Sequence, residues 1–217
     1  MSSKTIKGII FDLDGTLLDT LGDLTTAVNL TTQFYHLPSL TQAEVKNNIG
    51  NGFVVTITKS CPGLEPQEIP KAVERFKAYY ATCFLNDSKA YPGIDELILK
   101  LKERNIRLAV VSNKVQSYVE QLISSRFPGI PFDLVYGETD KHMKKPNPQG
   151  LIEAYKAMGL DPSEVLMIGD SKADIESALS LNMPMSAVVW GFSKEEDLRG
   201  WGAKSLLYSA QEVLEAL

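Results

Sequence analysis

Two aspartates, Asp12 and Asp14, follow directly on a short apolar run, residues 9–11 (IIF), within the segment DLDGT at residues 12–16. Such a run predicts a buried β-strand, and the two charges mark the point where the strand leaves the core. Gly15 permits a tight turn, and the Thr16 hydroxyl can bond a neighbouring carboxylate. Packing two carboxylates at a desolvated strand end raises the pKa of one of them unless a cation lies between them. The segment therefore predicts a metal site, an acid–base pair, or both.

A structural alternative exists for this pair. Aspartate is a preferred N-cap residue, so Asp12 and Asp14 could instead cap a helix that begins near Leu17. The remainder of the chain decides between the two interpretations.

The composition is that of an ordinary globular protein, with 217 residues, 44% hydrophobic and 23% charged. This length allows one large domain or a domain with an insert. A net charge of −5, with no tract rich in lysine and arginine, argues against a nucleic-acid surface. Cys61 and Cys83 do not form a CxxC pair, and we expect free thiols. Since neither a signal peptide nor a membrane-spanning run is evident, we expect a cytoplasmic protein with no membrane partner.

Apolar, β-branched runs alternate with helical periodicity along most of the chain. This alternation, with strands that are apolar throughout, predicts a doubly wound, mainly parallel α/β sheet of Rossmann-like type. Strands are expected at residues 6–11, 108–111, 134–136, 165–168 and 185–189. Helical spacing is present at residues 97–101, 115–122, 151–158 and 175–179.

The alternation fails between residues 19 and 89, where the pattern is helical only. We expect helices at residues 21–35, 41–48, 53–60 and 66–85, separated by Pro38, by the turn at residues 50–52 (GNG) and by Pro62. Residues 1–18 and 90–217 would then form an α/β catalytic core, and residues 19–89 an α-helical cap. Because the insert leaves after the first strand, it is well placed to act as a lid over the carboxyl end of the sheet.

Three further polar clusters follow predicted strands. Ser112 and Asn113 end one strand, where a hydroxyl, an amide and the N–H groups of a starting helix could hold phosphate oxygens. Asp170 ends another strand, and Asp174, four residues on, would share a helical face with it, which suits a metal ligand and its supporting group. Lys145, next to Pro146, has a restricted backbone and could deliver a fixed positive charge.

Each of these clusters also has an ordinary structural explanation, as a helix cap or as a solvated surface group. Together they place carboxylates, a hydroxyl and a lysine at one edge of a parallel sheet. Phosphoryl transfer needs this set: carboxylates hold Mg²⁺, the hydroxyl and the cation bind the transferring group, and one carboxylate can attack phosphorus.

In these motifs the chain resembles the haloacid dehalogenase superfamily. The segment DLDGT, Ser112-Asn113, Lys145, and Gly169-Asp170-Ser171 with Asp174 match the four motifs of that superfamily in order. The resemblance implies that Asp12 is the nucleophile and Asp14 the general acid and base. It implies further that Mg²⁺ is held by the Asp12 side chain, the Asp14 carbonyl and Asp170, with Asp174 in support. Ser112, the Asn113 backbone and Lys145 would bind phosphoryl oxygens.

The second aspartate is typical of phosphatases and mutases rather than dehalogenases. Residues 19–24 (DTLGDL), 49–52 (IGNG) and 189–191 (VWG) are similar to the phosphoglycolate phosphatase branch. The resemblance implies a Mg²⁺-dependent phosphate monoester hydrolase that acts on a small anionic metabolite through an aspartyl-phosphate, with phosphoglycolate as the expected substrate. The alternatives are a pyrophosphatase, a sugar-phosphate phosphatase, a β-phosphoglucomutase and a catalytically inactive binding relative. The sequence leaves the oligomeric state open.

Overall fold

The computed structural model describes residues 5–49 and 52–217 of the chain. The chain divides into two compact units, Met1–Leu18 with Ala90–Leu217, and Asp19–Lys89. We call the first the core unit and the second the helical unit. In the described part of the chain no helix combines the length and the apolar character needed to span a membrane.

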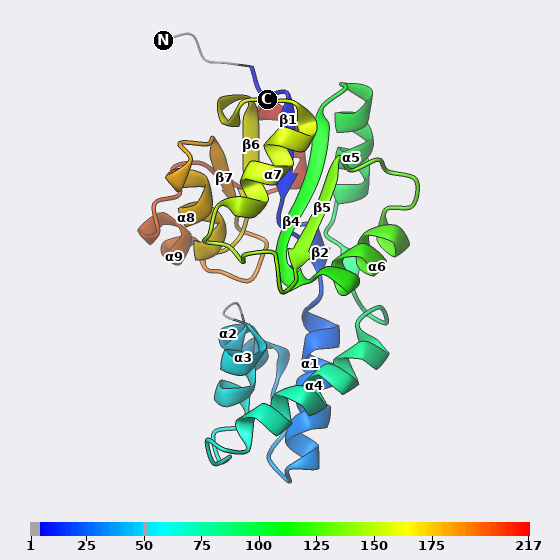
Figure 1. The fold of residues 1–217 in the computed structure, drawn as a ribbon, viewed down its shortest axis with the longest axis vertical. Helices are drawn as coiled ribbons and strands as arrows, with labels where there is room; N and C mark the ends of the chain where they lie inside the picture. The colour runs from blue at the N-terminus through cyan, green and yellow to red at the C-terminus, as the bar shows by residue number, and fades with distance from the viewer. Residues whose placement is uncertain (1–4, 50–51) are drawn as a thin grey trace. The chain divides into compact units, whose positions relative to one another are not determined.

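A six-stranded parallel sheet forms the centre of the described core unit, in the order β5-β4-β1-β6-β7-β8 (Figure 1). The central strand β1 is buried along its whole length, as its apolar sequence predicts. The strands are β1 (Gly8–Phe11), β4 (Arg107–Val115), β5 (Leu134–Glu138), β6 (Val165–Gly169), β7 (Met185–Val188) and β8 (Leu206–Leu207).

The register of these strands determines which loops meet. Phe11, the last residue of β1, lies level with Val110 of β4 and with Ile168 of β6. All three strands run in the same direction, so the residues that follow these positions emerge at one edge of the sheet. Ligands bind at this carboxyl edge in open α/β sheets.

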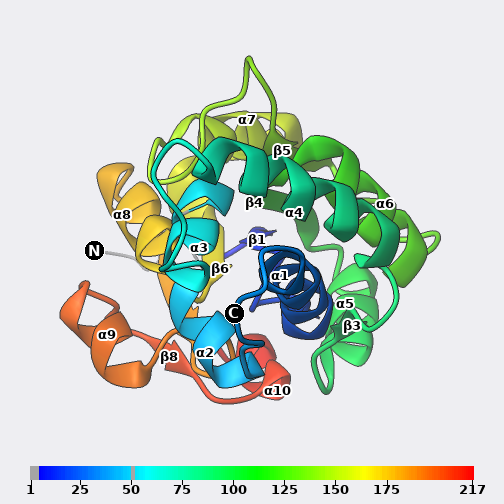
Figure 2. The ribbon, with the colours of Figure 1, turned by 90° about the horizontal axis from the view of Figure 1, so that it is seen from below.

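Helices cover both faces of the sheet, which confirms the doubly wound α/β fold. Figure 2 shows α5 and α7 on opposite sides of β1 and β4. Leu151 and Ala154 of α7 pack with Ile10 of β1 in one buried cluster, which Ala178 of α8 also joins. The helices of this unit are α5 (Ile94–Glu103), α6 (Gln116–Arg126), α7 (Gln149–Met158), α8 (Lys172–Ser180), α9 (Glu195–Gly200) and α10 (Ala210–Glu215), with a 3-10 turn at Pro162–Glu164.

Two features of the core unit differ from the sequence-based expectation. β4 continues four residues past Val111, the end of its apolar run, so Ser112 and Asn113 lie within a strand rather than at the start of a helix. The C-terminal elements α9, β8 and α10 were not expected. They are too short, at six, two and six residues, to show a clear period in the sequence.

The helical unit contains four helices in its described residues. Figure 1 shows α1 and α4 side by side, and the two helices pack together. The helices are α1 (Leu21–Phe34), α2 (Gln42–Asn48), α3 (Phe53–Ser60) and α4 (Ile69–Cys83). Two short strands, β2 (Leu18–Asp19) and β3 (Lys89–Ala90), pair where the chain enters and leaves this unit.

Local signals explain several helix boundaries here. Thr41 caps α2 in a capping box with Glu44. α4 begins three residues after Pro66, the start expected from the sequence, and carries a proline in its first turn, where a missing N–H costs little. Of the expected turn at residues 50–52, only Gly52 is described, and it precedes α3 with φ of 85°; the first two residues of the turn lie outside the described residues.

A buried carboxylate connects the two ends of the helical unit. Asp23, in the first turn of α1, accepts hydrogen bonds from Asp87 N at 2.9 Å, from Ser88 N at 2.9 Å and from Ser88 Oγ at 2.7 Å. Ser88 follows α4, so one side chain fixes the start of α1 against the segment that leaves the unit.

Candidate active site

Three buried aspartates gather at the carboxyl edge of the sheet. Asp12 follows β1, Asp170 follows β6, and Asp174 lies in the first turn of α8. Each offers a carboxylate oxygen, and these oxygens lie within 4.8 Å of one another. This is the one cluster of its kind among the described residues, and its oxygen donors are of the type that hard divalent cations prefer.

The electrostatics of this cluster favour a cation. Burial raises the pKa of Asp12 to about 7, and the charge of Asp174 adds to the rise. Burial, followed by the charges of Asp12 and Asp174, raises the pKa of Asp170 well above its usual range. Without a further positive charge, the folded protein therefore retains protons on these carboxyls that a free aspartate would release.

Lys145 supplies one positive charge to the cluster. Its Nζ lies 2.8 Å from Asp12 Oδ1, and it donates to Asp174 Oδ1 and to the Val111 carbonyl at 2.6 Å each. Burial alone would lower the pKa of Lys145, but the charges of Asp12 and Asp174 outweigh it and raise that pKa. Lys144, in contrast, pairs with Glu138 and is 43% exposed.

The carboxylate of Asp14 has a different partner. Lys114 Nζ donates to both of its oxygens, at 2.8 and 2.9 Å. Lys114 lies on β4 with its side chain only 3% exposed, whereas the side chain of Asp14 is 21% exposed. The two aspartates of the DLDGT segment are therefore directed to two separate cations.

Sequence reasoning missed Lys114 because the apolar run of β4 ends at Val111. The signal that could have found it is the period of two along a strand, since Ser112 and Lys114 share a face if the strand continues. Both residues are in fact buried, at 4% and 7% exposure.

The structure brings Ser112 and Asn113 to the same edge of the sheet. Ser112 is buried, and its Oγ accepts a hydrogen bond from Lys114 N at 3.2 Å. The side chain of Asn113 bonds the main chain of Lys145, donating from Nδ2 to its carbonyl at 2.8 Å and accepting from its N–H at 2.7 Å. Asn113 therefore joins β4 to the loop that carries the buried lysine.

Asp170 is held by groups from two loops. Thr16 Oγ1 donates to Asp170 Oδ1 at 3.3 Å, and Phe192 N donates to Asp170 Oδ2 at 2.6 Å. Trp190 Nε1 in turn donates to the Thr16 carbonyl at 3.1 Å. Gly191 is required here, because a Cβ at this position would lie 2.5 Å from the Asp170 side chain. Gly191 of the VWG segment thus lies directly against Asp170 of the acidic cluster.

The structure excludes the cap alternative for Asp12 and Asp14, and one local expectation is wrong. No helix begins near Leu17: the chain turns over residues 13–17 and enters β2, and α1 begins at Leu21, so Asp12 and Asp14 are not helix caps. Asp170 and Asp174 do not share a helical face either, because Ser171 is the N-cap of α8 and Asp170 precedes it. The Asp174 carboxylate instead accepts from Ser171 N and Oγ, at 3.0 and 2.5 Å, in a capping box.

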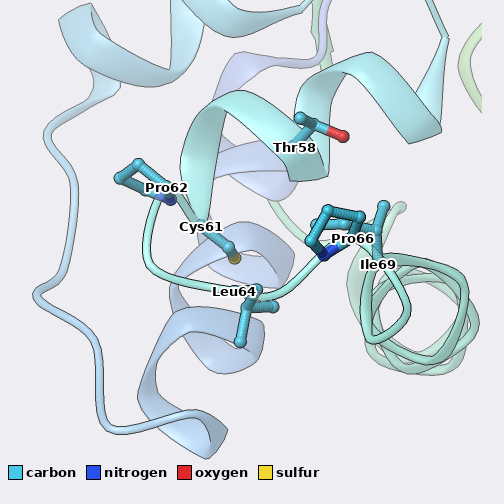
Figure 3. A pocket seen from close by; sticks show the side chains of 6 residues that line it. All are labelled: Thr58, Cys61, Pro62, Leu64, Pro66 and Ile69. Atoms are coloured by element: carbon cyan, nitrogen blue, oxygen red, sulfur yellow. The ribbon is translucent and has the colours of Figure 1, made fainter.

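The helical unit contains a cavity of its own, with a volume of about 300 Å³. Figure 3 shows its lining, which comes from the end of α3, the following loop and the start of α4. The lining residues are Thr58, Cys61, Pro62, Leu64, Pro66 and Ile69. None of these lining residues is charged.

A doubly wound sheet with a buried carboxylate cluster and a buried lysine at its carboxyl edge defines an α/β enzyme suited to a divalent cation and an anionic substrate. The family model of haloacid dehalogenase-like hydrolases matches residues 9–188. The chain belongs to this family, and it is a hydrolase.

Similar proteins agree with this assignment. A phosphoglycolate phosphatase of Colwellia psychrerythraea is 30% identical over 216 residues, covering 96% of each chain. One of Haemophilus influenzae is 32% identical, over 86% of this chain and 87% of its own. A crystal structure from Lactobacillus delbrueckii subsp. bulgaricus, provisionally assigned as a phosphoglycolate phosphatase, is 33% identical with a TM-score of 0.92 over 98% of both chains. The family and these relatives indicate a phosphatase, as the sequence predicts.

Proposed function

We propose that this chain hydrolyses a phosphate monoester through an aspartyl-phosphate on Asp12. The observation that carries the proposal is the division of charges at the end of β1. Asp12 lies against Lys145 in the acidic cluster, and Asp14, two residues on, is held apart by Lys114. This division supports the assignment of one carboxylate as the nucleophile and of the other as the carrier of protons.

The donor set of the acidic cluster fits Mg²⁺. Two of the three carboxylates, those of Asp12 and Asp174, contact the ammonium group of Lys145, and burial of the unbalanced negative charge raises the pKa of Asp12 and Asp170. The Asp12 and Asp170 side chains and the Asp14 carbonyl would hold the ion, with Asp174 in support. When bound, Mg²⁺ would neutralise charge on the phosphoryl group.

The residues of the chain then have distinct tasks. A carboxylate oxygen of Asp12 forms a bond to phosphorus as the bond to the leaving alcohol breaks, and Asp14 gives that alcohol a proton. Asp14 next accepts a proton from the water that attacks the aspartyl-phosphate, which releases inorganic phosphate and restores Asp12. Ser112, the Asn113 N–H and Lys145 would bind the phosphoryl oxygens throughout.

The proposed substrate is phosphoglycolate, a small anionic metabolite. Support comes from the names of relatives at about 30% identity that align along nearly the whole chain. Residues 19–89 would act as the cap that selects the substrate, a role typical of an insert that follows the first strand. Pyrophosphate, sugar phosphates and a mutase reaction are the alternatives. A cytoplasmic location and the absence of nucleic-acid and membrane partners belong to the same proposal.

Release of inorganic phosphate from a panel of phosphorylated metabolites, with and without Mg²⁺, tests this proposal. We expect the highest kcat/KM for phosphoglycolate and a loss of turnover when Mg²⁺ is chelated. Asp12→Asn should abolish turnover, whereas Asp133→Asn, which alters a surface ion pair with Arg107, should leave it near the wild-type value.

Three other outcomes would contradict parts of the proposed function. Turnover by Asp12→Asn at the wild-type rate would exclude the nucleophile. Preference for another ester would replace phosphoglycolate while leaving the chemistry intact. Binding of phosphorylated ligands without any turnover would identify an inactive binding relative.

A further inference from the structure

Asn113 makes a two-point contact with the main chain of Lys145, although the two residues are 32 positions apart. The Asn113 Nδ2 group donates to the Lys145 carbonyl at 2.8 Å, and the Lys145 N–H donates to Asn113 Oδ1 at 2.7 Å. Two paired residues in an antiparallel sheet likewise exchange two N–H···O hydrogen bonds through their main chains. Here the side chain of Asn113 takes the place of one of the two main chains. It ties β4 to the loop between β5 and α7.

The carboxamide is the side-chain group that suits this task. A buried main-chain N–H and a buried carbonyl each need a partner, and the next residue, Pro146, has no N–H to offer. Asparagine supplies one donor and one acceptor in a single plane from a short, stiff side chain. Aspartate of the same size would keep only the acceptor.

The contact of Asn113 with the Lys145 main chain matters because the Lys145 ammonium group lies in the acidic cluster. Its Nζ contacts Asp12, Asp174 and the Val111 carbonyl, and it would exchange one of these contacts for a phosphoryl oxygen when substrate binds. A lysine side chain has four rotatable carbon–carbon bonds, so the position of its charge depends on where its main chain is fixed. Asn113 fixes that point from the strand that also carries Ser112.

We propose that the Asn113 side chain is a positioning residue that sets the reach of Lys145 to the transferring phosphoryl group. The inference rests on the proposed phosphatase function and adds a task for the side chain, separate from the Asn113 N–H at the phosphate. The Asn113 carboxamide works through Lys145 and does not itself touch the substrate.

A double-mutant cycle with Lys145 separates this role from a general effect on folding. We expect Asn113→Ala to lower kcat by about ten- to a hundredfold, because a shift of about 1 Å in a charged group can cost that much. In a Lys145→Ala background the same change should lower kcat by no more than about twofold, since the group that it positions is gone. The inhibition constant of inorganic phosphate should follow the same pattern, rising in the first background and staying level in the second.

Two further variants sharpen the test. Asn113→Asp retains the acceptor and loses the donor, and we expect it to lose activity as well, which also covers the case in which Asn113→Ala does not fold. Asn147→Ala is the matched control: it removes a carboxamide from the same loop, one that accepts from Gln149 N at 3.0 Å and makes no recorded contact with Lys145 among the described residues. It should keep kcat near the wild-type value.

Effects of Asn113→Ala and Lys145→Ala that multiply would overturn the proposal, as would full activity in Asn113→Ala or in Asn113→Asp. If the wild-type protein hydrolyses no phosphate ester, the proposed function fails instead. Binding of inorganic phosphate by the same four proteins, measured by calorimetry, then still tests whether Asn113 acts through Lys145.

Discussion

Each of the two aspartates that follow β1 pairs with a different lysine. Lys145 forms an ion pair with Asp12, and Lys114 donates hydrogen bonds to both carboxylate oxygens of Asp14. A charge-assisted contact to both oxygens fixes the direction of a carboxylate as well as its place. In the proposed reaction Asp14 delivers a proton to the leaving alcohol, and its direction would decide whether it can; Lys114 would then bear on the chemical step more than on binding.

We therefore expect Lys114→Met to lower kcat by about ten- to a hundredfold, within the range that general acid–base catalysis contributes, with a smaller change in KM. The matched control is Lys144→Met, which removes an exposed lysine paired with Glu138 and should leave kcat close to wild type. Steady-state kinetics on the best substrate of the panel provides the comparison. Equal kcat values for the two variants would show that Asp14 does not need its lysine.

At the scale of elements, the helical unit depends on how its two ends are joined. Asp23 accepts three hydrogen bonds from Asp87 N, Ser88 N and Ser88 Oγ, and it is only 2% exposed. Asp23→Ala leaves these donors without the carboxylate, and we expect the free energy of unfolding to fall by about 2–4 kcal/mol. Urea unfolding followed by the helical signal measures this loss.

The neighbour of Ser88 provides the control for that measurement. Asp87→Ala removes an exposed carboxylate but retains the main-chain N–H that Asp23 accepts, so it should change the free energy of unfolding by no more than about 0.5 kcal/mol. Similar losses in the two variants would mean that charge at this end of the unit, rather than the Asp23 contacts, stabilises α1 and α4.

The length of β4 shows where sequence patterns stop being informative. Hydrophobic periodicity located the strand to Val111, because up to that point both faces are buried against apolar neighbours. Beyond Val111 the strand runs on through the polar residues Ser112, Asn113 and Lys114. Lys114 bonds Asp14 in the segment after β1, and Asn113 bonds Lys145 in the loop after β5. Long-range polar contacts of this kind leave no local period, so the contact of Lys114 with Asp14 is visible only in the folded chain.

For the whole molecule, the doubly wound α/β fold followed from the sequence because its apolar strands and amphipathic helices alternate. The position of Asp12 and Asp170 at one edge followed as well, since parallel strands in register end together. The side-chain geometry did not follow: Asp174 reaches the cluster from its capping box with Ser171, and the α9 to α10 region has elements too short to predict. The periodicity of the sequence therefore predicts which loops lie together at the edge of the sheet, whereas the side-chain contacts depend on tertiary packing.

The acidic cluster also couples the stability of the fold to pH and to metal. The pKa of an aspartate in the unfolded chain is about 3.9. In the folded protein the pKa of Asp12 is raised to about 7, so its carboxyl keeps the proton to a higher pH. Without metal, Asp12 therefore lowers the stability of the fold progressively as pH rises from about 4 to about 7, and the effect then levels off. A divalent cation bound in the cluster would remove this penalty, and it would have to displace the proton.

We expect Mg²⁺ to bind at least about tenfold more weakly at pH 6 than at pH 8, because most of Asp12 is protonated at the lower pH and the raised pKa of Asp170 acts in the same direction. The rise in melting temperature at a fixed, subsaturating Mg²⁺ concentration should accordingly be larger at pH 8. Differential scanning calorimetry with Mg²⁺ and with a chelator, at both pH values, measures this rise in melting temperature. Asp170→Asn should largely remove the rise at either pH, since it takes one ligand from the cluster. A rise of equal size at pH 6 and pH 8 in the wild-type protein would mean that Asp12 is already ionised at pH 6, and that burial does not hold its proton.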